Sequence, residues 1–304
     1  MNRREFISLT NLALASYAMP TGTCEAAQAS NRRGIEFAFF TDTHIQPELN
    51  APSGCAMAFE KIRSLRPAFA VQGGDHVYDA IGATHGNAAK LFDLYARTEQ
   101  ALAVKTHHVM GNHDVFGLSA ANLESDPEYG KKMYQDRFGS IYYSFDFAGY
   151  HFIVLDSIQL TPDFSYEARI DTAQLGWLKK DLVALPKEMP TLVFTHVPLV
   201  TGALSYGPYR ADKVGKTSIV NAYEVLPLFE SRNVLGVFQG HTHINEVVRF
   251  RRIPYISCGA VCGNWWHGSR WGTPEGFTMI SLNGDECNWR YHTYGFRSVD
   301  PQDS

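Results

Sequence analysis

The stretch Ile35–His44, which reads IEFAFFTDTH, joins a run of apolar residues to a polar cluster. Residues 35–40 are apolar apart from Glu36, and Thr41-Asp42-Thr43-His44 follows at once. A short apolar run that stops at polar residues is typical of a buried strand in an α/β sheet. We therefore predict a strand over residues 35–40 whose carboxyl end presents Asp42 and His44.

The same pattern recurs farther along the chain. The further apolar runs and the polar clusters that follow them are Phe69–Gln72 before Gly73–His76, Thr106–Met110 before Gly111–Asp114, Leu192–Phe194 before Thr195–His196, and Val234–Gln239 before Gly240–His243. Loops at the carboxyl ends of strands gather at one edge of an open α/β sheet, so we expect all these clusters to meet there. Gly74, Gly111 and Gly240 precede key polar residues, where we expect the backbone to turn sharply.

Helix-like and strand-like stretches fill the remainder of the chain. The helices are predicted over residues 56–65, 88–103, 172–184 and 221–230, and the further strands over 141–147, 151–155, 247–250, 255–257, 277–282 and 289–294. This order predicts an α/β fold, specifically a four-layer α/β/β/α sandwich of two mixed β-sheets flanked by helices. No repeat or composition break interrupts residues 30–304, which favours a single domain.

Composition and charge narrow the class of protein. The chain has 304 residues, of which 45% are hydrophobic, and its net charge is -4. These values are ordinary for a globular domain with a full-sized core. The slightly acidic balance gives no electrostatic case for binding a nucleic-acid polymer or an anionic membrane.

Residues 1–29 have the features of a targeting segment. Arg3 and Arg4 precede a mostly apolar stretch over residues 6–19, and Ala27-Gln28-Ala29 supplies a small-x-small cleavage pattern before Ser30. The paired arginines resemble a twin-arginine signal, which implies the twin-arginine export machinery as a partner and a periplasmic or secreted location. An amphipathic N-terminal helix is the alternative. Stable membrane insertion is not expected, because the apolar stretch is shorter than the roughly 20 residues that a span needs.

Four cysteines follow this segment: Cys55, Cys258, Cys262 and Cys287. In an oxidising compartment they allow two disulfides in any of three pairings. The alternative is free, buried thiols that pack as small hydrophobic groups.

The polar clusters contain the ligand types of a hard or borderline metal site. Imidazole and carboxylate ligands without thiolate suit Mn, Fe or Zn. His241 and His243 are two residues apart, so both can be ligands only if the loop turns or if they bind different ions. The clusters supply Asp and His side chains together with a single Asn, Asn112.

The blocks Asp42-x-His44, Gly74-Asp75, Gly111-Asn112-His113-Asp114, His196 and Gly240-His241-x-His243, in this order, resemble those of the calcineurin-like metallophosphoesterase family. The resemblance implies two divalent metal ions, with Asp75 bridging them. It implies that Asp42, His44 and His243 hold the first ion, and that Asn112, His196 and His241 complete the second. It further implies that His113 is a general acid or a transition-state clamp, oriented by Asp114.

Two close cations also imply a mechanism. A water shared between the ions loses a proton near neutral pH, and the resulting hydroxide attacks phosphorus in line. His113 would then protonate the departing alkoxide. We therefore expect a phosphoesterase that acts on a small phosphate ester, with phosphodiesters favoured.

Two alternatives remain at this stage. Gly74-Asp75-His76-Val77-Tyr78 matches the Gly-Asp-x-x-Tyr block of purple acid phosphatases, which are monoesterases in which the tyrosine ligates ferric iron. His44 stands where that branch has glycine, so Tyr78 is expected to pack beside the site. The second alternative is a non-catalytic scaffold on the same fold, although every ligand position is filled here.

Substrate-binding residues are sought in two Gly-containing segments. The adjacent Trp265 and Trp266 follow the last metal block, and one of them could face the crevice and stack on the substrate. Tyr206 and Arg210 lie after His196 and could form part of the pocket wall, with Arg210 available to a second phosphate or carboxylate. The alternative for the tryptophans is packing at a sheet corner.

Overall fold

The computed structural model describes residues 34–119, 123–206 and 210–302. These residues fall within one unit of the chain, Arg32–Ser304. The predicted targeting segment, residues 1–29, lies outside the described residues. None of the helices among the described residues is long and apolar enough to cross a membrane.

Strand β1 lies in the middle of a five-stranded sheet with the order β13-β12-β1-β2-β3. It pairs in parallel with β2 and antiparallel with β12, so the sheet is mixed. The bounds of these strands are β1 (Ile35–Phe40), β2 (Ala70–Gln72), β3 (Thr106–His108), β12 (Gly276–Asn283) and β13 (Glu286–Thr293).

A second, six-stranded sheet has the order β10-β11-β9-β8-β5-β4. Its inner strands β11, β9, β8 and β5 are parallel, and antiparallel strands lie at both edges. The bounds are β4 (Tyr143–Phe147), β5 (Tyr150–Leu155), β8 (Thr191–Thr195), β9 (Val234–Gln239), β10 (Glu246–Phe250) and β11 (Ile253–Ser257). A short hairpin of β6 (Ile158–Thr161) and β7 (Ser165–Ala168) stands apart from both sheets.

Aromatic side chains fill the space between the two large sheets. Phe37 and Phe39 of β1 point into this layer, where the ring of Phe39 lies 5.7 Å from that of Phe194 on β8. The alternate residues of β1 point the other way, and Phe40 packs 5.3 Å from Phe59 of a covering helix. Because β1 is buried on both faces, its sequence is a nearly continuous apolar run.

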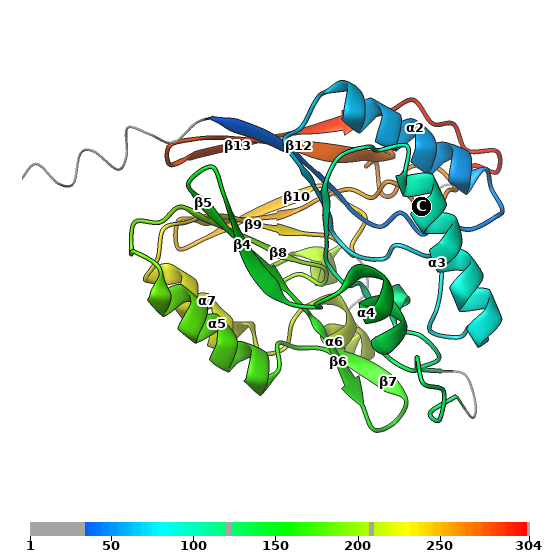
Figure 1. Ribbon diagram of the computed structural model, residues 1–304, viewed down its shortest axis with the longest axis horizontal. Coiled ribbons are helices and arrows are strands. Elements are labelled where there is room, and N and C mark those ends of the chain that lie inside the picture. The colour runs from blue at the N-terminus through cyan, green and yellow to red at the C-terminus, as the bar shows by residue number, and fades with distance from the viewer. Residues whose placement is uncertain (1–33, 120–122, 207–209, 303–304) are drawn as a thin grey trace, which may run out of the picture. The chain divides into compact units, whose positions relative to one another are not determined.

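Helices cover the outer faces of both sheets, which gives the predicted four layers (Figure 1). Helices α2 and α3 lie over the five-stranded sheet, and α5 and α7 lie over the six-stranded sheet. The helix bounds are α2 (Ala51–Ser64), α3 (His85–Glu99), α4 (Lys132–Phe138), α5 (Thr172–Ala184), α6 (Val214–Thr217) and α7 (Ala222–Glu230), with short 3-10 helices η1 (Asn112–Asp114), η2 (Ala203–Ser205) and η3 (Ala211–Lys213). The predicted fold class is therefore confirmed.

The four cysteines among the described residues are free thiols. Cys55, Cys258 and Cys262 are buried, and Cys287 is partly buried. Burial raises the pKa of the Cys258 and Cys287 thiols to about 12, so both are protonated and inert at neutral pH. This arrangement matches the interpretation of the cysteines as small packed groups.

Candidate metal centre

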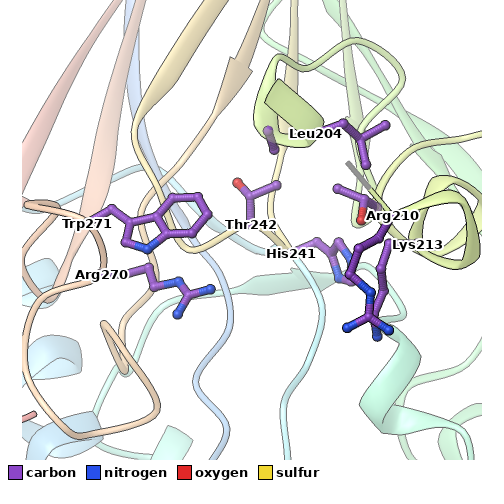
Figure 2. A pocket seen from close by; sticks show the side chains of 9 residues that line it. Leu204, Arg210, Lys213, His241, Thr242, Arg270 and Trp271 are labelled. Carbon is purple, nitrogen blue, oxygen red and sulfur yellow. The ribbon is translucent and has the colours of Figure 1, made fainter. Parts of the chain in front are cut away.

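The polar clusters meet where the carboxyl ends of strands from both sheets come together. The first sheet contributes Asp42 and His44 after β1 and Asp75 after β2, and the second contributes His196 after β8. A pocket lined by His241, which follows β9, opens at the same place (Figure 2). The predicted gathering of strand ends therefore produces one site, although the strands belong to two sheets.

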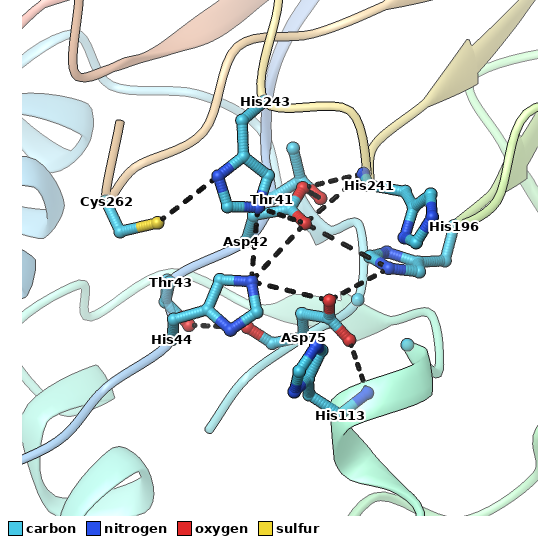
Figure 3. A network of polar contacts seen from close by, with 12 residues as sticks. Thr41, Asp42, Thr43, His44, Asp75, His113, His196, His241, His243 and Cys262 are labelled. Atoms are coloured by element: carbon cyan, nitrogen blue, oxygen red, sulfur yellow. Dashed lines mark hydrogen bonds and ion pairs between the residues drawn. The ribbon is translucent and has the colours of Figure 1, made fainter. Parts of the chain in front are cut away.

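Three atoms converge at one end of the polar network (Figure 3). His243 Nε2 lies 3.2 Å from His44 Nε2 and 3.2 Å from Asp42 Oδ1, and His44 Nε2 lies 3.7 Å from the same oxygen. Ligands of a tetrahedral ion with bonds near 2.0–2.1 Å stand about 3.3 Å apart. The three atoms thus have the spacing of ligands that share one ion.

A second group forms around the other carboxylate. Asp75 Oδ2 lies 3.1 Å from His196 Nε2 and 3.4 Å from His44 Nε2, so a single oxygen adjoins both groups. His241 offers a ring nitrogen within 4.8 Å of ligand atoms of Asp75 and His196. This is the arrangement expected of a bridging carboxylate between two ions.

Asn112 reaches the same place through η1. The next residue, His113, donates its backbone N–H to Asp75 Oδ1 at 2.8 Å, which fixes η1 against the bridging carboxylate. Asn112 is buried, and its Oδ1 has no hydrogen-bond partner among the described residues. A buried amide oxygen without a partner is costly, and a cation would satisfy it.

The histidine rings are held with Nε2 toward the centre. His196 Nδ1 lies 2.8 Å from the carbonyl oxygen of Gly73, and His243 Nδ1 lies 2.7 Å from that of Gly263. A carbonyl only accepts hydrogen bonds, so Nδ1 donates a proton in both rings and Nε2 is the nitrogen left for an ion. Such contacts orient metal-ligating histidines.

Several ligands occupy the left-handed backbone region. The φ angles are 54° at Asp42, 38° at His44, 55° at Asp75, 71° at His241 and 61° at His243. Residues other than glycine adopt this region at a cost of about 1 kcal/mol or more, and they cluster at functional sites. This conformation also explains how His241 and His243, two residues apart, can both be ligands. The loop turns at both residues and places them in different ligand groups.

Two of the glycines serve the site in different ways. Gly74 has a φ of 105°, as the predicted sharp turn requires. Gly111 is extended, with a φ of -100°, so the expected turn is wrong at this position. Glycine is required at position 111 because there is no room for a side chain: a Cβ there would lie 2.1 Å from the backbone nitrogen of Asp75.

The electrostatics of the centre favour cations. Burial alone would lower the pKa of His196, but the carboxylates of Asp75 and Asp42 outweigh burial and raise it to about 9. Burial would raise the pKa of Asp42, but His243 and His196 outweigh it and hold that pKa well below its usual range. Two fully buried carboxylates of this kind require positive partners. The residues present therefore fit a pair of divalent ions, and the ligand types leave their identity open between Mn, Fe and Zn.

The structure corrects the expected contact between Asp114 and His113. Asp114 is fully buried, and its carboxylate accepts hydrogen bonds from the backbone N–H groups of His76 at 2.8 Å, Gly111 at 2.9 Å and Asp75 at 3.0 Å. His76 Nδ1 lies a further 2.9 Å from it. Asp114 therefore holds the ligand loops together from behind.

His113 has a different carboxylate beside it. Its Nδ1 lies 3.5 Å from Asp79 Oδ1, too far for a strong hydrogen bond but close enough for an ion pair. Burial lowers the pKa of His113, but the carboxylates of Asp75 and Asp79 outweigh it, so the pKa is raised. The residue that can orient His113 is thus Asp79.

The two tryptophans differ completely. The Trp265 ring is half-buried and lies 3.9 Å from the ring of His44 and 5.0 Å from that of His113, so it forms a wall of the site. Trp266 is fully buried, and its Nε1 donates to the carbonyl oxygen of His44 at 3.0 Å. The prediction that Trp266 contacts substrate is wrong, because its side chain packs behind the ligand loop.

Tyr78 and two of the predicted substrate residues, Tyr206 and Arg210, lie around the site. The ring of Tyr78 meets the edge of Trp265 at 5.5 Å, as expected of a packing role. Arg210 lines the pocket beside His241, and it also pairs with Asp212 at 2.7 Å. The hydroxyl of Tyr206 donates to Glu246, and Tyr206 lines a neighbouring pocket with Asn245 and Trp271 instead of the pocket beside His241.

Some residues of the site were missed in the sequence. Asp79 lies four residues after Asp75 of the Gly-Asp block, and a carboxylate so close to that block could have been recognised as part of the site. Cys262, whose Sγ lies 3.7 Å from His243 Nδ1, gave no signal because its spacing from Cys258 is not that of a zinc site. Lys213, Arg270 and Trp271 line the pocket and come from segments without any recognisable pattern.

The sequence matches the family model described as calcineurin-like phosphoesterase over residues 35–245. Among curated proteins, it is 30% identical over 182 residues to purple acid phosphatase 22 of Arabidopsis thaliana. That match covers 57% of this chain and 38% of the plant protein, so the chain spans well under half of its relative's length.

Solved structures share the fold. A dimetal phosphatase from Danio rerio superposes with a TM-score of 0.59 at 17% identity, covering 85% of this chain and 99% of that one. GAP50 of Plasmodium, described as the anchor in the inner membrane complex, superposes with a TM-score of 0.56 at 17% identity, covering 89% and 90%. At such identities the likeness concerns the fold alone.

Proposed function

The chain belongs to the calcineurin-like phosphoesterase family, and we propose that it is a metal-dependent hydrolase that cleaves phosphodiesters. The observation that carries this proposal is the paired ligand groups joined by Asp75 Oδ2. A non-catalytic scaffold would not need the left-handed backbone at Asp42, His44, Asp75, His241 and His243, or a buried Asn112 Oδ1 without a hydrogen-bond partner among the described residues.

The residues of the chain divide the work of the reaction. Asp42, His44 and His243 would hold one ion, while Asn112, His196 and His241 would hold the other, with Asp75 between them. Ions held there supply Lewis-acid neutralisation of phosphoryl charge and acidify a water molecule. His113, whose protonated form is favoured by Asp75 and Asp79, donates a proton to the departing alkoxide oxygen. The ring of Trp265 lies beside His113 and His44 on this side of the site.

The surroundings of the centre favour a diester over a monoester. Trp265 offers an aromatic surface beside His113, and the pocket beside His241 offers a separate space. Figure 3 shows His113 and His241 on different sides of Asp75. Two separate surfaces suit a substrate with an organic group on each side of the phosphorus.

A paired assay tests the proposal. We expect bis-p-nitrophenyl phosphate to be hydrolysed faster than p-nitrophenyl phosphate, with Mn or with Fe and Zn, and neither to be hydrolysed after complete chelation. Asp75→Ala should lose both activities together with bound metal. Activity that survives chelation or persists in Asp75→Ala contradicts the two-ion mechanism, and faster hydrolysis of the monoester contradicts the substrate class.

The likeness to purple acid phosphatase 22 favours a second candidate, a monoesterase with a tyrosinate-iron bond. Tyr78 would have to be the ligand, yet its side chain is 41% exposed and its ring contacts Trp265. A ferric tyrosinate absorbs visible light. We expect the iron-loaded protein to lack such a band, and Tyr78→Phe to retain its iron. A visible band that disappears in Tyr78→Phe would establish the purple type.

We also propose export by the twin-arginine route. Arg3-Arg4 and the cleavage pattern before Ser30 support this location, where the substrates would be small periplasmic or extracellular phosphate esters. Replacing both arginines with lysine in the full chain should leave the protein in the cytoplasm with residues 1–29 attached. Unchanged export and processing of that variant would refute the route.

A further inference from the structure

The pocket beside His241 has a strongly cationic wall. Its volume is about 250 Å³, and Figure 2 shows Arg270 and Trp271 on one side, Arg210 and Lys213 on the other, and His241 between them. No Asp or Glu lines it in the part of the chain that the structure describes. Three cations therefore surround one small space that adjoins a predicted metal ligand.

Arg270 is the most buried of the three cations in this pocket. It is half-buried, and its guanidinium lies 4.6 Å from the ring centroid of Trp271, with Nη1 3.2 Å from Asn264 Oδ1. Among the described residues no carboxylate pairs with it. Burial lowers the pKa of Arg270, although the group stays charged at any physiological pH. A partly desolvated cation of this kind gains most from an anion that enters the pocket.

The other two cations are available to the same anion. Lys213 is exposed, and no ion pair involves it among the described residues. Arg210 pairs with Asp212, but both side chains are largely exposed. Solvent screening weakens an exposed pair of this kind, so a ligand can compete with Asp212 for the guanidinium.

The position of the pocket indicates which part of a substrate reaches it. The group that departs receives its proton from His113, beside Trp265, so it lies on that side. His241 lies on a different side of Asp75 (Figure 3). The substituent that stays on the phosphorus therefore extends toward His241, Arg270 and Trp271.

We propose that this pocket binds a second anionic group, a phosphate or a carboxylate, on the retained part of the substrate, while Trp271 contacts the planar or apolar portion beside it. The inference rests on the proposed function and specifies its substrate class. The substrates are diesters that carry an additional negative charge away from the scissile phosphorus.

Matched substrates test this assignment with the metal-loaded protein. 4-Nitrophenyl phenyl phosphate is the neutral-substituent reference, and its 3-carboxyphenyl and 3-phosphonophenyl analogues keep the same leaving group and add one anion. We expect the wild type to prefer an anionic analogue by about tenfold in kcat/KM, the size of one charge-assisted contact. The comparison of carboxylate with phosphonate identifies which anion the pocket takes.

Variants separate the pocket from general charge effects. Arg270→Gln and Lys213→Gln should each remove most of the preference, because they lower kcat/KM more for the anionic analogues than for the reference. Arg270→Lys, which keeps the charge, should restore part of it. Arg251→Gln removes an equal charge from a distant arginine paired with Glu230, and it should keep the wild-type preference.

The outcomes distinguish this inference from the proposed function. Equal kcat/KM for all three substrates, or equal losses on all of them in Arg270→Gln, overturns the anion pocket while leaving the hydrolase intact. Loss of preference in Arg251→Gln as large as that in Arg270→Gln also overturns it. Absence of hydrolysis of every substrate with every metal refutes the proposed function itself.

Discussion

Replacing Asp114 with asparagine should damage the framework of the metal centre before it affects the chemistry. The Asp114 carboxylate accepts from three backbone N–H groups at 2.8–3.0 Å and adjoins His76 Nδ1. A hydrogen bond to a charged group contributes about 1.5–3 kcal/mol. Asparagine keeps one acceptor and turns an NH₂ group toward donors, so at least one of these contacts becomes repulsive. We expect a loss of about 3–5 kcal/mol in the free energy of unfolding.

Urea unfolding of the metal-free protein measures this loss without a contribution from bound ions. Metal content after reloading should fall as well, because the loops that carry Asp75 and Asn112 are no longer held together. Asp79→Asn is the matched control. Its carboxylate is 39% exposed, so it should change stability by less than about 1 kcal/mol and keep the metals, while lowering turnover.

One result would refute this reasoning. If Asp114→Asn unfolds at the wild-type urea concentration and retains its metals, but loses turnover, Asp114 acts on the chemistry as its place in the Asn-His-Asp sequence first indicated. Asp79→Asn would then have wild-type turnover.

Three further predictions concern other parts of the molecule. His113→Ala should lower kcat far more for poor leaving groups than for nitrophenolate, and equal losses in steady-state assays would exclude a proton donor. Trp266→Ala should lower the free energy of unfolding in urea by about 3–5 kcal/mol, because a fully buried ring is lost. Trp265→Ala should mainly raise KM. Similar losses of stability in the two variants would contradict the different positions of the two rings. Burial would lower the pKa of His151, but the carboxylates of Asp181 and Asp146 outweigh burial and raise it. The charged pair therefore stabilises the folded protein fully below about pH 6.5, and this stabilisation is lost as the pH rises through the raised pKa. Asp181→Asn should therefore cost about 1 kcal/mol at pH 6 and less at pH 9, and a pH-independent difference would disprove the charge pair.

The large elements were predictable because their sequence patterns are strong. The bounds of β1, β9 and α5 agree with the prediction, and Asp171, which accepts from the Gln174 N–H at 2.7 Å, marks the start of α5. The hairpin of β6 and β7 was missed because its short strands mix polar and apolar residues. Helix α4 was missed as well, since it is only seven residues long.

The meeting of the candidate ligands in one place was predictable because each comes after a strand, whereas the residues around them were not predictable. His113 and Asp114 are consecutive in a 3-10 helix, where neighbouring side chains point about 120° apart, so adjacency in sequence did not mean contact. Asp79 reaches His113 because the loop folds back, with the Ala80 N–H bonded to the His113 carbonyl at 2.9 Å. The anion pocket joins Lys213 to Arg270 across a long separation in sequence, which no local pattern encodes.

The left-handed backbone conformation of five candidate ligands lowers the stability of the metal-free protein. Glycine at position 42, 44, 75, 241 or 243 would lower the backbone strain by about 1 kcal/mol at each position, and it would also remove a candidate metal ligand. A search for thermostable variants of the metal-free protein would therefore favour changes that abolish catalysis. The same search with metal present would eliminate them. Selection for stability therefore favours glycine at these positions when the ions are absent and the candidate ligands when the ions are present.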